Sequence, residues 1–131
     1  MLTAPTNATP GSPWTATGSI GVVSAVGNWT ASVSLSAFTN KDVPTAEPVS
    51  VAGATYRAGA ASCVSALGLP LGRTIPPTTV TVASSPRDFR SSPSGLGSLV
   101  CLADWDFALT LPLPPTMLAG RYAGVLTHSV A

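Results

Sequence analysis

The chain has 131 residues and a mass of 13.1 kDa, which suits a single domain. Only 8% of its residues are charged and its net charge is +1, so it lacks the clustered cations on which nucleic-acid binding depends. Its 32 Ser and Thr and 25 Gly and Pro residues predict short strands and turns rather than helices.

The chain also lacks the marks of membrane insertion and export. No stretch approaches the roughly 18 consecutive apolar residues of a membrane span. Residues 1–7 contain neither a basic nor an apolar segment, so they do not resemble a signal peptide. A surface with so few charges is poorly protected against association. We therefore expect no membrane partner, and a surface that is covered by partner proteins or repeated in an array.

The first part of the chain predicts an arm followed by two strands. Prolines exclude a helix over residues 1–15, which predict an extended arm before a single domain over residues 16–131. The arm is either a leader without contacts or a segment that lies against a neighbouring subunit. A strand is expected over 15–26, with Ile20, Val22 and Val26 on one face and a turn at Gly27-Asn28. Strict alternation predicts a second strand over 29–38.

The middle of the chain is less regular. In order, we expect loops at 39–42 and 43–48, a weaker strand at 49–57, an irregular segment or one helical turn at 58–72, a short strand at 80–83, and the longest loop at 84–98.

The end of the chain predicts the fold class. Residues 99–111 form the strongest strand, with an unbroken apolar face from Leu99 to Leu111, and a last strand is expected over 121–130. The pattern indicates an all-β, antiparallel, immunoglobulin-like β-sandwich of six to eight strands, with a small barrel as the alternative. Six side chains are expected to meet in one core between two sheets: Trp29, Val33, Leu35, Trp105, Phe107 and Leu109.

Cys63 and Cys101 are the only cysteines, and two cysteines cannot form a structural zinc site alone. Cys101 lies on the apolar face of its strand and should be buried. If Cys63 packs opposite Cys101, a disulfide would close a 39-residue segment and stabilise the fold by about 3–4 kcal/mol. The alternative is two buried free thiols, which a reducing cytoplasm favours.

The sequence offers little chemistry for catalysis. His128 is the only histidine, so a catalytic triad would need a serine and an aspartate to converge on it. It lies on the same face of the last expected strand as Leu126 and Val130, which indicates a packed or edge-exposed structural role. Asp104 and Asp106 share one strand face but have no third partner for a Ca²⁺ site or an acid–base pair, so we interpret them as a solvated polar face. We expect no catalytic residue, no bound metal, no cofactor and no enzymatic activity.

The loop at 84–98 contains the most distinctive group of side chains outside the strands. Arg87, Phe89 and Arg90 combine two cations with an aromatic ring, and we expect them to be exposed and to contact a partner. The alternative is a solvated loop tip without a partner.

Three motifs stand near the two ends of the chain: GSIGVV at 18–23, NWTASVSLSAFT at 28–39 and AGRYAGVLTHSVA at 119–131. The first two together resemble the opening of the WxL-like surface domains of Gram-positive bacteria, and the third is similar to the ending of secreted actinobacterial members of that family. Trp105 and the Leu109–Pro112 run fall where that family places a strand before its final hairpin. The resemblance implies a non-catalytic β-sandwich that associates with peptidoglycan or other surface proteins.

Two functions of different classes fit these observations. The first is a non-catalytic structural protein of a bacteriophage virion, such as a capsid decoration or other exterior head or tail protein, that contacts the major capsid protein and copies of itself. The second is a secreted, extracellular domain of the bacterial cell surface that binds cell-wall glycan. Low charge and the absence of a leader favour the virion protein, which is the function that the sequence predicts, whereas the strand motifs support the cell-surface domain.

Overall fold

The computed structural model describes residues 2–3, 11–22, 28–65, 70–92, 101–116, 118 and 121–130. These residues form strands and turns and no helix, which confirms the all-β class, and they include no helical segment able to cross a membrane. In chain order the strands are β1 (Leu2–Thr3), β2 (Pro13–Val22), β3 (Thr30–Leu35), β4 (Thr39–Asn40), β5 (Thr55–Ala58), β6 (Ala61–Val64), β7 (Pro70–Ile75), β8 (Thr78–Thr81), β9 (Arg87–Ser91), β10 (Ala103–Pro112), β11 (Tyr122–Gly124) and β12 (Leu126–Val130).

The longest strands form one layer of the molecule. Its four-stranded sheet has the order β2-β10-β5-β8, and β2 pairs with β10 along its whole length without a register shift. The β6-β7 pair extends this layer at one end, where Val64 bridges to Leu102. The predicted strand at 99–111 is confirmed over 103–111, while Leu99 lies outside the described residues.

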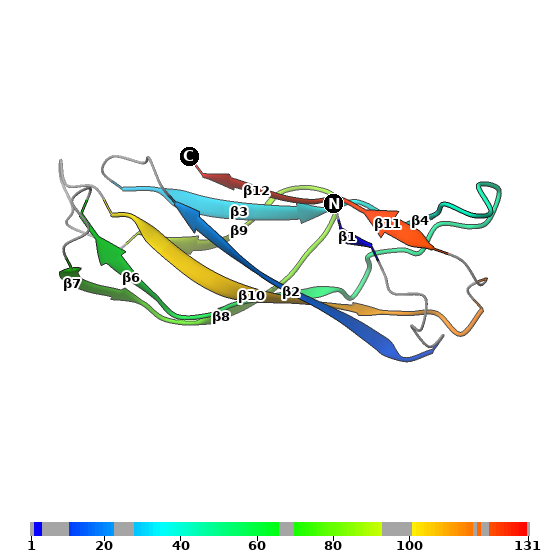
Figure 1. Ribbon diagram of the computed structural model, residues 1–131, viewed down its shortest axis with the longest axis horizontal. Coiled ribbons are helices and arrows are strands. Elements are labelled where there is room, and N and C mark those ends of the chain that lie inside the picture. Colours follow the sequence, from blue (N-terminus) through cyan, green and yellow to red (C-terminus); the bar gives the residue numbers. More distant parts are fainter. Residues whose placement is uncertain are drawn as a thin grey trace.

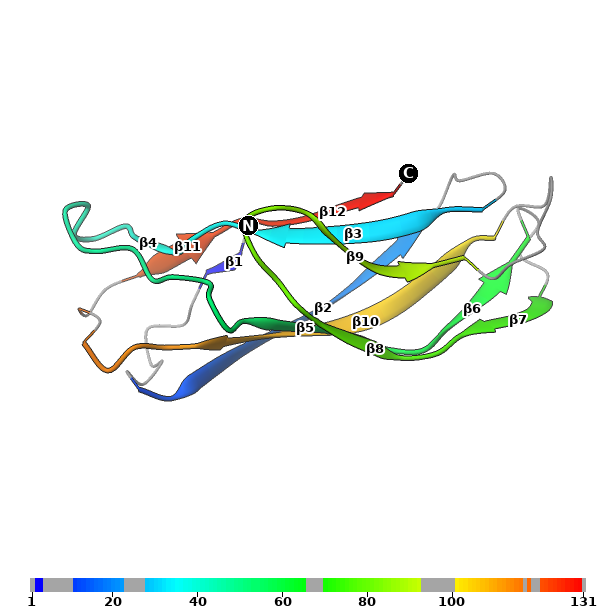
Figure 2. The same ribbon diagram turned by 180° about the vertical axis from the view of Figure 1, so that it is seen from behind.

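A second layer covers the inner face of this sheet (Figures 1 and 2). It consists of the sheet β12-β3-β9 and, at the end of the molecule away from β6 and β7, the sheet β1-β11-β4. β11 leads almost directly into β12, so these two sheets follow one another within the layer. Two layers of antiparallel strands are the arrangement expected of a β-sandwich.

One hydrophobic core lies between the two layers. Trp29 stacks on Trp105 of β10, with ring centroids 6.4 Å apart, and the Trp29 Nε1 group donates a hydrogen bond of 3.1 Å to the carbonyl of Cys101. The core predicted from alternation is confirmed: five of its members are buried, and Phe107 is half-buried and packs against them. Those five are Trp29, Val33, Leu35, Trp105 and Leu109.

Several segments differ from their expected conformation. Residues 58–72 contain β6 and the start of β7 rather than an irregular segment or a helical turn, and β9 lies within the expected loop at 84–98. The expected last strand divides into β11 and β12, which belong to different sheets. Thr39–Asn40 is a short strand rather than part of a loop. Each of these strands is short and has a weak local pattern, so its conformation depends on a partner strand distant in sequence.

The described parts of the expected arm belong to the domain itself. β1 pairs with β11 of the same chain, and residues 13–15 are the beginning of β2, so a boundary at residue 15 falls inside a strand. Residues 4–10, like Val26 and Gly27 at the expected end of the first strand, lie outside the described residues.

Candidate functional site

The outer face of the four-stranded sheet carries a row of threonines, one from each strand. Thr110 of β10 lies between Thr15 of β2 and Thr55 of β5, and Thr55 is paired in turn with Thr81 of β8. Adjacent strands are about 4.8 Å apart, so four hydroxyl-bearing side chains repeat at that spacing. The hydroxyls of Thr15 and Thr110 are 3.3 Å apart. We call these four residues the threonine row.

Further polar side chains continue this face alongside the threonine row. The next row in register consists of Thr17, Ala108, Arg57 and Thr79. Beyond it, Ser19 pairs with Asp106, and the Ser19 hydroxyl donates a hydrogen bond of 2.6 Å to the Asp106 carboxylate. Two shallow hollows, of about 560 and 210 Å³, flank Asp106. The larger is lined in part by Arg57, and the smaller by Asp104.

This face offers hydrogen-bond donors and acceptors on a regular support. Hydroxyl groups can donate and accept, the carboxylates of Asp104 and Asp106 accept, and the guanidinium of Arg57 donates. Both aspartates are exposed, as the interpretation of a solvated polar face requires. Within the described residues, no three or more His, Cys, Asp or Glu side chains gather as a possible metal site. The chemistry of the face therefore suits a polar ligand bound through hydrogen bonds.

A second group of polar side chains lies inside the sandwich. The Nε2 atom of His128 on β12 is 2.8 Å from the hydroxyl of Tyr56, and the Nε1 group of Trp105 donates to the same hydroxyl over 3.2 Å. Because an indole N–H only donates, we assign the Tyr56 hydrogen to His128 Nε2, which requires a neutral imidazole with its proton on Nδ1. Burial lowers the pKa of His128 and raises that of Tyr56, so both are uncharged at neutral pH. His128 is thus half-buried and packed, which is one of the two structural roles expected of it.

The expectation of an exposed contact loop is wrong for Phe89 and Arg90. Both lie in β9 and are only 6% exposed, whereas Arg87 is exposed. The register between β3 and β9 shifts at Ala31/Ser32, where Arg90 pairs with Ala31 and Asp88 with Ser32. A β-bulge of this kind lets two consecutive residues turn toward the same side of a sheet.

Arg90 fastens the two layers together at the margin of the core. Its guanidinium lies 4.6 Å from the centre of the Trp105 ring, and its Nη2 group donates to the carbonyls of Gly59, over 2.7 Å, and Pro76, over 3.3 Å. Its Nε and Nη1 groups are buried and have no hydrogen-bond partner in the described structure. Burial therefore lowers the pKa of Arg90. Burying a cation is costly, and no described acidic side chain forms an ion pair with Arg90. Its attractive contacts are instead with backbone carbonyls and aromatic rings.

Cys63 of β6 and Cys101, two residues before β10, form a disulfide with their Cα atoms 4.8 Å apart. Of the two alternatives that the sequence left open, the structure has the bonded one. Both residues are buried, and the adjacent Val64 and Leu102 form the bridge between β6 and the same segment. The bond therefore fastens the β6-β7 pair to the four-stranded sheet.

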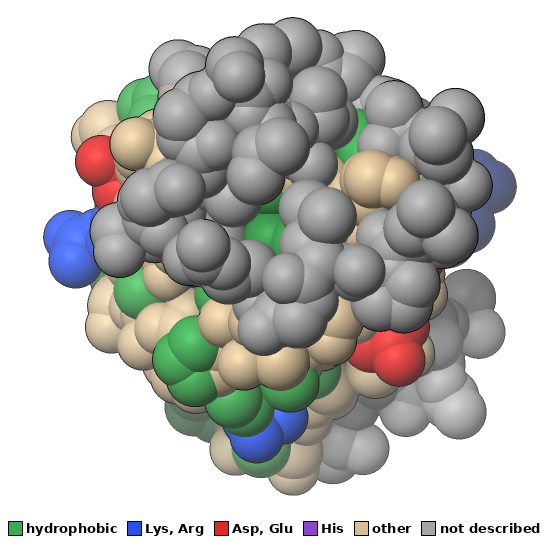
Figure 3. Space-filling model, turned by 90° about the vertical axis from the view of Figure 1, so that its left-hand side faces the viewer, with side chains coloured by type: hydrophobic (Ala, Val, Ile, Leu, Met, Phe, Trp, Pro, Cys, Tyr) green, Lys and Arg blue, Asp and Glu red, His purple; other side chains and the backbone are tan. Residues whose placement is uncertain are grey.

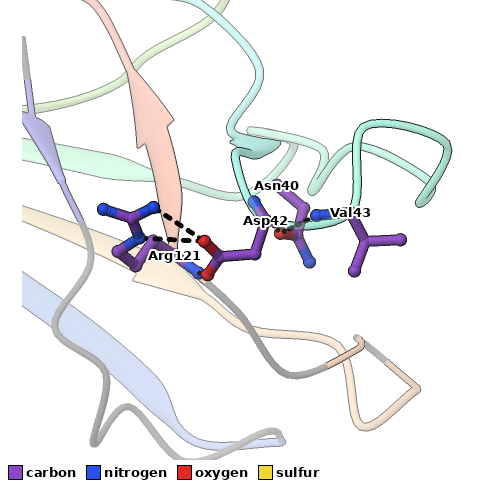
Figure 4. Close-up of polar contacts among 4 residues, drawn as sticks. All are labelled: Asn40, Asp42, Val43 and Arg121. Carbon is purple, nitrogen blue, oxygen red and sulfur yellow. Dashed lines mark hydrogen bonds and ion pairs between the residues drawn. The ribbon is translucent and has the colours of Figure 1, made fainter.

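An exposed polar contact fixes the loop after β4 (Figure 4). The Asp42 carboxylate accepts hydrogen bonds from Nε and Nη2 of Arg121, over 3.0 and 2.8 Å, and from the Arg121 backbone N–H over 2.8 Å. The hydrogen bonds from Arg121 hold the pKa of Asp42 below its usual range. The Asn40 side-chain oxygen accepts from the backbone N–H groups of Asp42 and Val43. These contacts give the loop a structural role.

Among the described side chains, Lys and Arg do not gather at the end of the sandwich that carries β6 and β7. In the view of that end, the visible Lys and Arg side chains of the described residues lie at separate points (Figure 3). Among the described residues, this view therefore shows no concentration of positive charge.

Sequence reasoning did not identify Thr55, Tyr56 or Arg57 as members of these two groups. The alternation in TYRA at 55–58 was the available signal, because it places Tyr56 on the opposite face from Thr55 and Arg57. That signal is only four residues long. The sheet order, which places β5 between β10 and β8, is what brings the threonines into one row.

Comparison of the chain with protein-family models, with curated proteins and with solved structures finds no match.

Proposed function

We propose that this chain is a non-catalytic domain of the bacterial cell surface that binds cell-wall glycan through the outer face of its four-stranded sheet. The observation that carries the proposal is the threonine row, with Arg57 and Asp106 beside it. A glycan presents hydroxyl and amide groups at regular intervals, which hydroxyl, carboxylate and guanidinium groups can bind. Strands hold such groups in fixed positions more accurately than loops do.

The disulfide supports a location outside the cytoplasm. Disulfides persist in oxidising, extracellular environments and are rare in the reducing cytoplasm, where phage particles are assembled. The Cys63–Cys101 bond therefore favours the cell-surface domain over the virion protein. The resemblance of both chain ends to WxL-like surface domains supports the same choice.

The surroundings of His128 support a binding role without catalysis. Its imidazole faces the core and is hydrogen-bonded to Tyr56, so it is not presented on the outer face. Glycan in a cell wall is a repeating polymer, and many weak contacts along it can raise avidity by about 10²–10⁴. A hydroxyl-rich face with shallow hollows is suited to binding of this kind.

The test is co-sedimentation of the purified chain with peptidoglycan sacculi. Thr55→Val with Thr110→Val removes two central hydroxyls of the threonine row while keeping the side-chain shape. Thr30→Val with Thr127→Val is the matched control on the other layer, since Thr30 also has a hydroxyl contact of 3.3 Å, with Ser91. Loss of two hydrogen bonds should weaken binding by about tenfold in the first variant only.

Three outcomes would overturn the proposal. The first is a wild-type chain that stays in the supernatant, and the second is an equal loss of binding in both double variants. The third is retention of the chain by purified phage capsids and not by sacculi, which would establish the virion function in its place.

A further inference from the structure

One edge of the four-stranded sheet lacks the features that normally protect a sheet edge. In the described part of the chain, β2 forms backbone pairs only with β10, so no described strand pairs with the N–H and C=O groups on its other side. Its ten residues, PWTATGSIGV, include no charge, their only proline is the first residue, and the pairing with β10 has no bulge. Natural edges are usually short, charged, bulged or interrupted by proline, because an open edge recruits further strands.

The other edge strands of the two main sheets have such protection. β9 carries Arg87 and Asp88 and contains the bulge opposite β3. β8 is only four residues long and β12 only five. Of these four edge strands, only β2, which is the longest, lacks such protection.

The inner side chains of β2 are incompletely covered. Trp14 and Ile20 pack against the core but are only partly buried, whereas the residues paired with them on β10, Leu111 and Trp105, are buried. β2 lies at the margin of its sheet, so the exposed parts of these two side chains adjoin the open edge. A strand added to this edge would bury apolar surface as well as satisfy backbone groups.

We propose that two copies of the chain pair through β2, antiparallel about a two-fold axis at Thr17, and so join two four-stranded sheets into one continuous sheet. In this register Trp14 lies opposite Ile20 of the second copy, and Thr15 lies opposite Ser19 of the second copy. Large apolar side chains then meet on the inner face and hydroxyls meet on the outer face, as in stable cross-strand pairs. This self-association does not depend on the proposed glycan binding.

The side-chain sizes along β2 favour a second copy over a strand of another protein. The inner residues Trp14, Ala16, Gly18 and Ile20 run large, small, small, large, which is the same order in either direction. An antiparallel two-fold pairing requires this kind of self-complementarity. An axis at Gly18 would place glycine opposite glycine, with no side chains to pack at the centre. No like charges would meet in either case, since β2 has none.

Light scattering on the purified full chain, with size-exclusion chromatography over a range of concentrations, tests this proposal. The wild type should show a concentration-dependent monomer–dimer equilibrium. Thr17→Lys places two ammonium groups opposite each other at the axis and should raise the dimer dissociation constant about fivefold to tenfold, and Thr17→Asp should do the same. An equimolar mixture of the two variants should restore a dimer that contains one chain of each.

Thr79→Lys is the matched control, because Thr79 lies in the same cross-strand row but on β8. It should dimerise like the wild type, and the far-UV circular dichroism of all three variants should match that of the wild type. A wild type that remains monomeric at about 1 mM, far above the micromolar range of ordinary weak dimers, would overturn the proposal and leave the edge to a strand of another protein. Undiminished dimerisation of Thr17→Lys, or no restoration in the mixture, would refute pairing at Thr17.

Discussion

Replacing Trp105 by alanine removes a side chain that joins the two layers through ring contacts, a cation–π contact and a hydrogen bond. The ring is 5% exposed and lies 6.4 Å from the ring of Trp29, 5.8 Å from that of Phe89 and 4.6 Å from the Arg90 guanidinium. Its Nε1 group donates to the Tyr56 hydroxyl, which in turn contacts His128. Its loss therefore removes core packing, the cation–π contact with Arg90 and the hydrogen bond to Tyr56 at the same time.

The expected magnitude follows from these contacts. Truncation of a buried tryptophan costs about 3–5 kcal/mol, and the loss of the cation–π contact adds roughly 0.5–2 kcal/mol. We expect the free energy of unfolding to fall by about 5 kcal/mol, measured by urea denaturation with far-UV circular dichroism. Because domains of this size are stable by only about 5–15 kcal/mol, Trp105→Ala can approach complete unfolding.

Trp105→Phe keeps the result interpretable, because it preserves a ring and removes the donor to Tyr56. We expect the free energy of unfolding to fall by about 1–3 kcal/mol, since the smaller ring packs less well and the Tyr56 oxygen loses the hydrogen bond that it accepts from Trp105, while Tyr56 still contacts His128. A cycle with Tyr56→Phe should give a coupling of about 1 kcal/mol. A loss below about 2 kcal/mol for Trp105→Ala would contradict the core described above, because no buried tryptophan is removed so cheaply.

Two further predictions concern the disulfide and the buried histidine. Replacing Cys63 and Cys101 by alanine should lower the free energy of unfolding by about 3–4 kcal/mol, because the bond joins residues 38 positions apart; equal urea midpoints for variant and wild type would show that the bond does not constrain the chain. Burial lowers the pKa of His128 in the folded state below the ordinary value of 6.5, so its contribution to stability is complete above pH 6.5 and is lost as the pH falls from there toward the folded-state pKa. The free energy of unfolding, measured by urea denaturation at a series of pH values, should change by no more than about 1.4 kcal/mol per pH unit in this range. This pH dependence should become weaker in His128→Gln. An unchanged pH dependence in that variant would assign it to other groups.

The sequence by itself determined the parts of this protein that depend on local alternation. β3, which spans Thr30–Leu35 within the strand expected over 29–38, and the long strand at 103–111 follow from apolar side chains at every second residue. The same parity predicted the exposed aspartates and the core that includes Trp29 and Trp105. The candidate site was foreseen only in part: Asp104, Asp106 and Thr110 follow from the alternation of one strand, but Thr15, Thr55 and Thr81 on the neighbouring strands were not identified.

The tertiary structure decided which strands lie next to one another and in which register. The threonine row exists because β5 lies between β10 and β8, and Phe89 and Arg90 are buried because a bulge interrupts the pairing of β9 with β3. Likewise, the pairing of Cys63 with Cys101 requires β6 to reach the segment before β10. Alternation specifies which face of a strand is apolar, but the choice of neighbour and register depends on contacts between residues far apart in the chain, and a shift of one residue exchanges the two faces.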